Sequence, residues 1–292
     1  MAEQKRRRGD RRDGYRIRDI DAMHYIIPHI FPNRCDNEAY ISERVDLTNI
    51  NRWLEEKNRN NPNADYKYRL FNTLVAAMLK TVVLRPRMNR FIKRGDMYQR
   101  SYISASFVVK KQFSDDAEEG LAVIYAGGGD TMDTIHEKIR AIVQEVKSDR
   151  LDESSDAMET VNRLPRFLKN FIIWVCMKLD ERGLVPKSLI ATDPYYSTVL
   201  LSNLGSIKLK SGYHHLANWG TNSVFVVVGE KKMTPFYSED GSFELRETVD
   251  LGLTVDERIA DGYYFSKTVR LLKTLLEHPE LLEQPFDTKV EC

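Results

Sequence analysis

Three charged residues end an apolar stretch near the C-terminus of the chain. Residues 251–255 are apolar and β-branched, and Asp256, Glu257 and Arg258 follow them directly. An Asp261-Gly262 dipeptide comes next, before a run whose apolar residues recur with helical spacing. This order predicts a strand, a turn and an amphipathic helix. A strand that delivers charged side chains into a turn holds them on a rigid frame, where reactive groups are often placed.

The rest of the chain alternates between helical and strand-like segments. Apolar residues recur with helical spacing in residues 70–83 and 164–184, and a third helix is predicted from Thr134 onward. Strand signals occur in residues 89–109, which contain an Arg-Gly-Asp turn, and in residues 198–201, 224–229 and 251–255. Because the β-rich segments are separated by helices, the pattern indicates one α/β domain built on a mixed sheet.

Composition narrows the function classes. The 292 residues carry a net charge of only +1, so no overall field attracts nucleic acid or an anionic membrane. The longest apolar run, residues 171–177, is far shorter than a membrane span. The three cysteines share no metal-ligand spacing, and the charged N-terminus has no apolar core of a signal peptide. We expect a cytoplasmic protein without a metal site.

The N-terminal residues differ from the rest in composition. Residues 1–14 are strongly basic and contain almost no apolar side chains, so we expect a disordered tail ahead of a single domain over residues 15–292. A second interpretation is that the tail makes a local contact with a phosphate or an acidic partner.

Several short motifs, in order along residues 15–285, resemble those of one enzyme family. The chain is similar to chloramphenicol-acetyltransferase-type acyltransferases, and more closely to the catalytic domain of the dihydrolipoamide acyltransferases of 2-oxoacid dehydrogenase complexes. The motifs are Val45-Asp-Leu-Thr48, the hairpin around Arg94-Gly-Asp96, Leu201-Ser-Asn-Leu-Gly205, the apolar strand 224–229, Asp256-Glu-Arg-x-x-Asp-Gly262 and the final Leu275-Leu-Glu-His-Pro-Glu-Leu-Leu282. The gap between Ser202 and Glu257 also fits the family.

The resemblance implies a fold, an assembly and a reaction. It implies a two-layer fold with a mixed sheet flanked by helices, and a homotrimer with its active site at a subunit interface. It also implies transfer of an acyl group between coenzyme A, or a lipoyl thiol, and an acceptor. The sequence shows no lipoyl or subunit-binding domain, so a lipoyl group would have to come from another, lipoyl-bearing protein.

The resemblance also implies roles for individual residues. Ser202 occupies the position of the hydroxyl that hydrogen-bonds the tetrahedral oxyanion, where charge develops only in the transition state. Asp261 corresponds to the aspartate that holds the loop through hydrogen bonds or a salt bridge, and Arg258 is its expected partner. Glu257 stands where the family has the histidine that removes the proton of the attacking thiol or hydroxyl.

The replacement of histidine by Glu257 changes how readily the attacking thiol can give up its proton. A thiol has a pKa of about 8.5 and a glutamic acid one of about 4.3, so proton transfer to an ordinary Glu is uphill by about 5–6 kcal/mol. With a neutral imidazole the gap in pKa is only about two units. Burial raises a carboxyl pKa by several units and would remove most of the difference.

Two interpretations of the function therefore remain open. In one, the chain is an acyltransferase whose base is Glu257, or else His214 or His215, which precede the strand at residues 224–229. In the other, it is a catalytically inactive relative that keeps the trimeric fold as a binding or scaffolding module. Structural or partly exposed histidines are the alternative interpretation of His214 and His215.

Overall fold

The computed structural model describes residues 5–61, 65–110, 119–147 and 161–291. Its central feature is a six-stranded mixed sheet with the strand order β2-β9-β8-β7-β5-β6. β7 is parallel to both of its neighbours, β5 and β8, and the other pairs are antiparallel. The strands are β2 (Glu38–Asp46), β5 (Ile103–Lys110), β6 (Glu119–Ala126), β7 (Val199–Asn203), β8 (Val224–Tyr237) and β9 (Phe243–Asp256).

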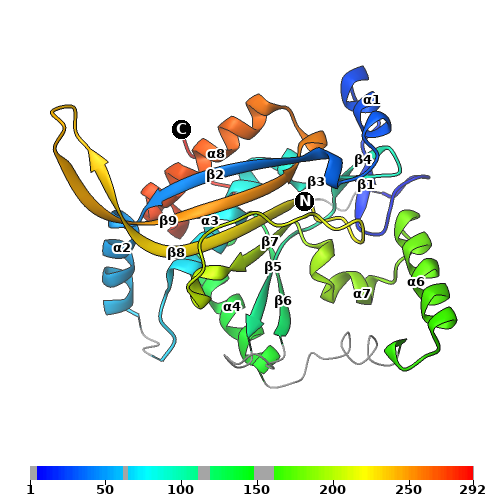
Figure 1. Cartoon of the computed structure of the whole chain (residues 1–292), viewed down its shortest axis with the longest axis horizontal. Helices are drawn as coiled ribbons and strands as arrows, with labels where there is room; N and C mark the ends of the chain where they lie inside the picture. Colours follow the sequence, from blue (N-terminus) through cyan, green and yellow to red (C-terminus); the bar gives the residue numbers. More distant parts are fainter. Residues whose placement is uncertain (1–4, 62–64, 111–118, 148–160, 292) are drawn as a thin grey trace.

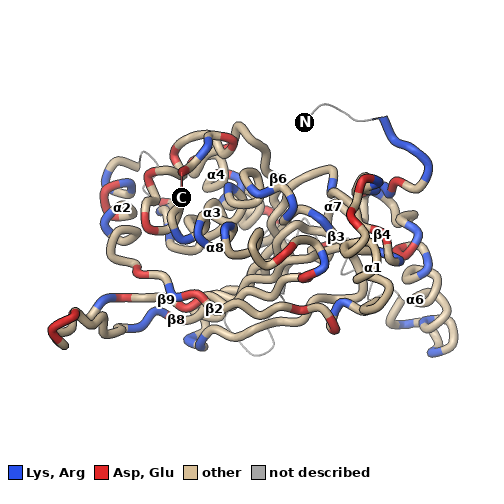
Figure 2. Tube along the Cα trace, turned by 90° about the horizontal axis from the view of Figure 1, so that it is seen from above, with Lys and Arg blue, Asp and Glu red and all other residues tan. Residues whose placement is uncertain are grey.

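Helices cover one face of this sheet, so the molecule has two layers (Figures 1 and 2). The helical layer consists of α2 (Thr48–Arg59), α3 (Leu70–Leu84), α4 (Met132–Lys147) and α8 (Gly262–Glu277). α3 is buried over most of its length, as its largely aliphatic sequence allows. Its Leu79 joins Val226 of β8 and Leu253 of β9 in one hydrophobic core. The predicted α/β class and the two-layer fold with a mixed sheet are confirmed.

Three more helices lie at one end of the sheet, on the right of Figure 1. They are α1 (Ala22–Ile30), α6 (Arg166–Glu181) and α7 (Lys187–Thr192). No helix in the described ranges is long and apolar enough to cross a membrane. Short 3-10 segments complete the fold: η1 (Cys35–Asn37), η2 (Pro86–Asn89), η3 (Pro194–Tyr196), η4 (Leu204–Ile207), η5 (Glu257–Ile259) and η6 (Pro279–Glu283).

A long irregular segment, residues 208–223, crosses the face of the sheet opposite the helices, and we call it the strap. It packs on the sheet where two strands have glycine. A Cβ atom on Gly229 would meet Ser211, and one on Gly252 would overlap the backbone of Gly212. Leu216 of the strap lies in a second apolar cluster, whose other buried members are Leu200, Phe225 and Val227. The central strands are therefore covered on both faces, which suits their continuous apolar sequence.

A small second sheet, with the order β1-β4-β3, lies beside the main one. Its strands are β1 (Gly14–Arg16), β3 (Arg90–Lys93) and β4 (Asp96–Arg100). The predicted hairpin turn is present, with Arg94 and Gly95 at positive φ angles of 52° and 79°. Two-residue turns with positive φ match the twist of the strands that they join.

The N-terminal residues form part of this region. Arg11 and Asp13 are buried and 2.9 Å apart, and Arg11 also contacts Asp180 of α6 at 3.5 Å. The disordered tail that we expected over residues 1–14 therefore does not extend to Arg11 and Asp13. Paired and hydrogen-bonded charges can be buried where single ones cannot, and composition alone does not reveal the pairing.

Candidate active site

The end of β9 is fixed by a buried ion pair between residues two apart. Arg258 Nη2 lies 2.7 Å from Asp256 Oδ2 and Arg258 Nε lies 2.8 Å from Asp256 Oδ1, with both side chains almost fully buried. The remaining amino group of Arg258 donates to the backbone carbonyl of Phe31 at 2.9 Å. Arg258 thus ties the η5 turn to the segment that follows α1.

Asp261 makes one hydrogen bond and one ion pair at the start of α8. Its carboxylate accepts a hydrogen bond from the Tyr264 backbone N–H at 2.8 Å and so caps the N-terminus of α8. This bond holds the pKa of Asp261 below its ordinary value. The ion-pair partner of Asp261 is Arg87, at 3.5 Å. The expected pairing of Asp261 with Arg258 is wrong, because Arg258 turns inward to Asp256.

Between these anchored residues, Glu257 is exposed. Its carboxylate makes no hydrogen bond or ion pair with any residue that the structure describes. It lines an open cavity of about 760 Å³ between α1, β2 and α8, a volume within the range of small-molecule sites. The wall is partly apolar, with Met23, Ile27, Ala39, Ile41, Phe265 and Val269, and partly polar, with His24, Glu43, Arg258, Asp261, Ser266, Arg270 and Lys273.

His24 in this cavity was not singled out from the sequence. Its Nδ1 lies 2.7 Å from Asp21 Oδ2, while Asp21 also accepts the His24 backbone N–H as the cap of α1. Hydrogen bonding of one ring nitrogen to a carboxylate orients an imidazole and leaves the other nitrogen free to accept a proton. The spacing Asp21-Ala-Met-His24 at a helix start is the signal that could have identified it.

His214 and His215, the alternative bases, lie on the strap. The His214 ring stacks on Phe225 with 4.3 Å between ring centroids, and His215 Nδ1 lies 3.4 Å from Glu38 Oε2. Neither residue lines the cavity of Glu257. Side chains alternate along β2, so Glu38 faces the strap whereas Ala39 faces the cavity. Within one chain the strap histidines are thus separated from Glu257 by the sheet.

Ser202 lies near the end of β7, on the strap side of the sheet. It is half-buried, and its hydroxyl has no hydrogen-bond partner within the described ranges. Ser202 is in register with Val227 of β8, which in turn pairs with Gly252 of β9. Glu257 lies five residues beyond Gly252 along β9, at about 3.3 Å per residue, and β9 lies two strands away from β7, at about 4.8 Å per strand. Together these offsets place Glu257 roughly 20 Å from Ser202. One chain therefore does not bring the two residues together.

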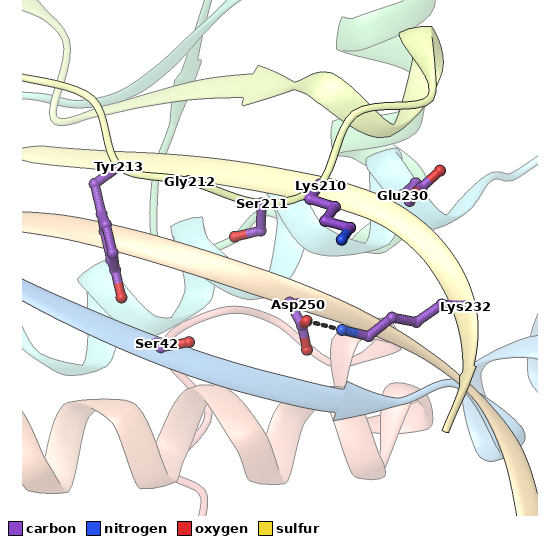
Figure 3. A pocket seen from close by; sticks show the side chains of 8 residues that line it. All are labelled: Ser42, Lys210, Ser211, Gly212, Tyr213, Glu230, Lys232 and Asp250. Atoms are coloured by element: carbon purple, nitrogen blue, oxygen red, sulfur yellow. Dashed lines mark hydrogen bonds and ion pairs between the residues drawn. The ribbon is translucent and has the colours of Figure 1, made fainter. Parts of the chain in front are cut away.

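A second, smaller pocket lies under the strap, and Figure 3 shows its lining. Lys232 of β8 forms an ion pair with Asp250 of β9 there, and Lys210 of the strap points toward the same carboxylate. Its volume of about 160 Å³ is below the range of typical ligand sites. The larger cavity is the better substrate candidate. Among the described residues, no group of three or more His, Cys, Asp or Glu could hold a metal ion.

Comparison with known proteins relates this geometry to a family. Residues 186–283, about a third of the chain, match the family of 2-oxoacid dehydrogenases acyltransferase (catalytic domain). The matched segment contains Ser202, Glu257 and Asp261 and runs from the start of α7 to η6. The resemblance seen in the sequence motifs is thus confirmed for this segment. No curated protein sequence matches the chain significantly.

Solved structures extend the similarity in fold to most of the chain. A probable dihydrolipoamide acetyltransferase from Listeria monocytogenes gives a TM-score of 0.59 at 14% identity, over 90% of this chain and 94% of that one. The dihydrolipoamide acetyltransferase of Azotobacter vinelandii gives 0.60 at 14% identity, over 92% and 94%. A chloramphenicol acetyltransferase gives 0.54 at 13% identity, over 90% and 99%. The fold is that of chloramphenicol-acetyltransferase-like acyltransferases.

Proposed function

We propose that this chain, with its acyltransferase fold and its family match over residues 186–283, transfers an acyl group at a site shared between two copies. The observation that carries the proposal is the placement of Ser202 and Glu257. Both side chains are free of partners among the described residues, and both sit on the ends of rigid strands, but they lie far apart in one chain. A homotrimer in which Ser202 of one copy meets Glu257 of the next would unite them.

The chemistry of such a site follows from the two groups. The acceptor thiol or hydroxyl gives its proton to Glu257 while its sulfur or oxygen attacks the carbonyl carbon of the acyl thioester. Ser202 donates a hydrogen bond to the oxyanion of the tetrahedral intermediate. When the intermediate collapses, the carbon–sulfur bond to the carrier breaks and the carrier thiolate takes up the proton. No metal takes part in this sequence of steps.

The structure of the Azotobacter vinelandii dihydrolipoamide acetyltransferase supports the assignment of residues. It concerns the role of one serine, one histidine and one asparagine in catalysis, and the asparagine follows the histidine by four positions. Asp261 follows Glu257 by the same four positions. We propose that Glu257 takes the place of the histidine, and that Asp261 takes a supporting place by capping α8 beside it.

Proton transfer to Glu257 requires a dry environment, because burial raises the pKa of a carboxyl group. Glu257 is exposed in the single chain, so a second copy over the cavity would have to exclude the water. His24, oriented by Asp21 in the same cavity, is the imidazole that could share or take over the role of base.

The acyl carrier is either coenzyme A or a lipoyl group on another protein. A cavity of about 760 Å³ can admit the end of an extended thioester arm. A similar structure is described as the cubic core of the pyruvate dehydrogenase multienzyme complex, which favours a lipoyl-bearing partner as the second carrier to test.

We place the protein in the cytoplasm, where Cys35 and Cys176, both free, would remain reduced.

The test is turnover of a panel of acyl-coenzyme A thioesters, with release of free thiol followed over time. We expect Glu257→Gln to lower kcat by about 10²–10⁴-fold, the usual contribution of a positioned base. Glu239→Gln, an exposed carboxylate on the β8–β9 hairpin, is the matched control and should match wild type. Equal turnover in wild type and Glu257→Gln would refute the role of Glu257 as the base. Loss of turnover in His24→Gln would then assign that role to His24.

The exposure of Glu257 supports a second candidate function, a non-catalytic binding or scaffolding module. In that case no thioester, on coenzyme A or on a lipoyl domain, would be turned over, although the chain would still assemble into trimers. A Glu257→His variant separates the two functions further. Gain of turnover in that variant would show that the rest of an acyltransferase site is intact.

A further inference from the structure

The cavity of about 760 Å³ between α1, β2 and α8 is lined by several charged groups, and most of them are paired. Arg258, Asp261 and His24 each pair with a charged group that lies outside the cavity lining. Within the lining, Lys273 of α8 lies 3.2 Å from Glu43 of β2. The charges of these five residues are therefore compensated inside the folded chain.

Two charged groups of the cavity are not compensated. One is Glu257, and the other is Arg270, an exposed residue of α8. The guanidinium of Arg270 makes no hydrogen bond or ion pair with any residue that the structure describes. A guanidinium offers a planar set of donors that matches a carboxylate, and this set is unused in the described part of the chain.

Arg270 lies well beyond the start of the cavity at η5. β2 begins at Glu38, which is in register with the last residue of β9, and α8 begins at Gly262, directly after η5. Both elements run away from η5 in the same direction, and the Lys273–Glu43 pair joins them farther along (Figure 1). From Gly262 to Arg270 the helix rises about 12 Å, at about 1.5 Å per residue. The cavity is thus elongated, with Glu257 at the η5 end.

The wall between the two uncompensated charges is apolar. Alternate residues of β2, Ala39 and Ile41, contribute to it from one side. Phe265 and Val269, one turn apart on α8, contribute from the other side. A straight apolar chain that starts at the η5 end would lie along this wall and reach the guanidinium of Arg270.

We propose that the cavity binds an acyl chain that is apolar along its length and ends in a carboxylate, and that Arg270 selects this carboxylate. The thioester carbon lies beside Glu257, the chain lies between β2 and α8, and the terminal carboxylate accepts hydrogen bonds from Arg270. The substrate class is the monothioester of a dicarboxylic acid of medium length. This inference rests on the proposed function, since it names the acyl group that the same site would transfer.

Other acyl groups fit the cavity less well. An acetyl group would occupy only the η5 end and would leave the apolar wall in contact with water. A chain with a methyl end would cover the wall but would gain nothing from Arg270. A chain that ends in an amine would be repelled by the guanidinium.

Calorimetric titration of the full chain measures binding apart from any turnover. Decanoate, decanol and decylamine share one chain length and differ in the charge of the end group. We expect wild type to bind decanoate about tenfold or more tightly than decanol, which is the usual gain from hydrogen bonds to a charged group, and to bind decylamine most weakly. Arg270→Gln should bind decanoate only as well as decanol. Ile41→Thr, which keeps a β-branched residue in β2, should weaken decanoate and decanol alike.

Lys267→Gln is the matched control for Arg270→Gln. Lys267 is exposed on α8 outside the cavity lining, so this change removes one positive charge from the same helix and leaves the cavity intact. It should bind decanoate as wild type does. Equal binding of decanoate by wild type and Arg270→Gln would overturn the proposal. So would equal binding of decanoate and decanol by wild type, or no binding of either.

Turnover distinguishes this inference from the proposed function. We expect wild type to favour the coenzyme A thioester of decanedioic acid over that of decanoic acid by about tenfold or more in kcat/KM. Arg270→Gln should lose this preference through a higher KM with little change in kcat, because the lost contact is made equally in the ground state and the transition state. Turnover of both thioesters without preference would overturn the inference and leave acyl transfer standing. Decanoate binding that depends on Arg270, without turnover of any thioester, would support the carboxylate site and overturn acyl transfer.

Discussion

Glu257 and Arg258 are adjacent in sequence and have opposite environments. Arg258 is buried and paired with Asp256, whereas Glu257 points into an open cavity without a partner among the described residues. The chain thus uses one charged residue to fix the turn and leaves the next free. This division is what a positioned reactive group requires.

The Arg258–Asp256 pair should contribute strongly to stability. We expect Arg258→Gln to lower the free energy of unfolding by about 3–5 kcal/mol, because it leaves the buried carboxylate of Asp256 without its partner. Urea denaturation at neutral pH measures the change. Arg44→Gln, which breaks the partly exposed pair with Asp250, is the control and should cost about 1 kcal/mol or less. Equal losses in both variants would contradict the assigned role of Arg258.

The sequence identified some residues of the site better than others. Glu257 and Ser202 were predicted at strand ends, and the structure places them there. The pairing of Arg258 with Asp261 was wrong, because a local sequence does not show which way a side chain turns. His24 was missed because it lies near the other end of the chain, and only the folded structure brings α1 beside α8.

Among the elements, the strap depends on two glycines in the strands beneath it. Gly252→Ala should lower the free energy of unfolding by about 1–3 kcal/mol, since the added Cβ would overlap the Gly212 backbone and push the strap outward. Limited proteolysis should then cut the strap faster than in wild type. Gly129→Ala is the control, because a Cβ there meets nothing within 4 Å. An unchanged cleavage rate in Gly252→Ala would argue against this packing.

α4 contains a buried histidine that makes stability depend on pH. His136 stacks on Tyr68 at 3.8 Å and lies 3.3 Å from the carbonyl of Tyr66, and burial lowers its pKa below 6.5. As the pH falls below about 6.5, the imidazole therefore binds a proton in the unfolded chain before it does so in the folded chain. The free energy of unfolding falls with pH until the lower pKa of the folded state is reached.

Urea denaturation between pH 7.5 and 5.5 checks this expectation. The free energy of unfolding of wild type should fall over the interval, and that of His136→Gln should fall less, since the variant lacks the titrating imidazole. A His278→Gln control, at an exposed histidine, should retain the steeper dependence. Identical pH dependence in wild type and His136→Gln would contradict the account.

The regular elements could be predicted from the sequence, but the strap could not. The segments at 70–83, 164–184 and the one after Asp261 had clear helical spacing and became α3, α6 and α8. The strap has no periodicity, and its position depends on backbone contacts with glycines in distant strands. Arg34 also holds the strap, because it donates hydrogen bonds to the backbone carbonyls of Gly220 and Asn222. Burial at this position lowers the pKa of Arg34 to about 10.

For the whole molecule, the distribution of charge matters more than its sum. Residues 5–18 carry a net charge of +6 although the whole chain carries only +1, and they contact the residues that follow α6. The sheet order likewise determines which residues can meet. Ser202 and Glu257 fall on different ends and faces of one sheet, and sequence spacing could not reveal this separation.

The central claim is that the acyl-transfer site forms between copies, and a mixing experiment tests it most directly. Glu257→Gln and Ser202→Ala chains, each inactive alone, are co-expressed in equal amounts. If each site takes Ser202 from one copy and Glu257 from the next, random assembly restores about one quarter of wild-type turnover. Mixed oligomers with no more activity than the separate variants, although light scattering shows them assembled, would contradict a shared site.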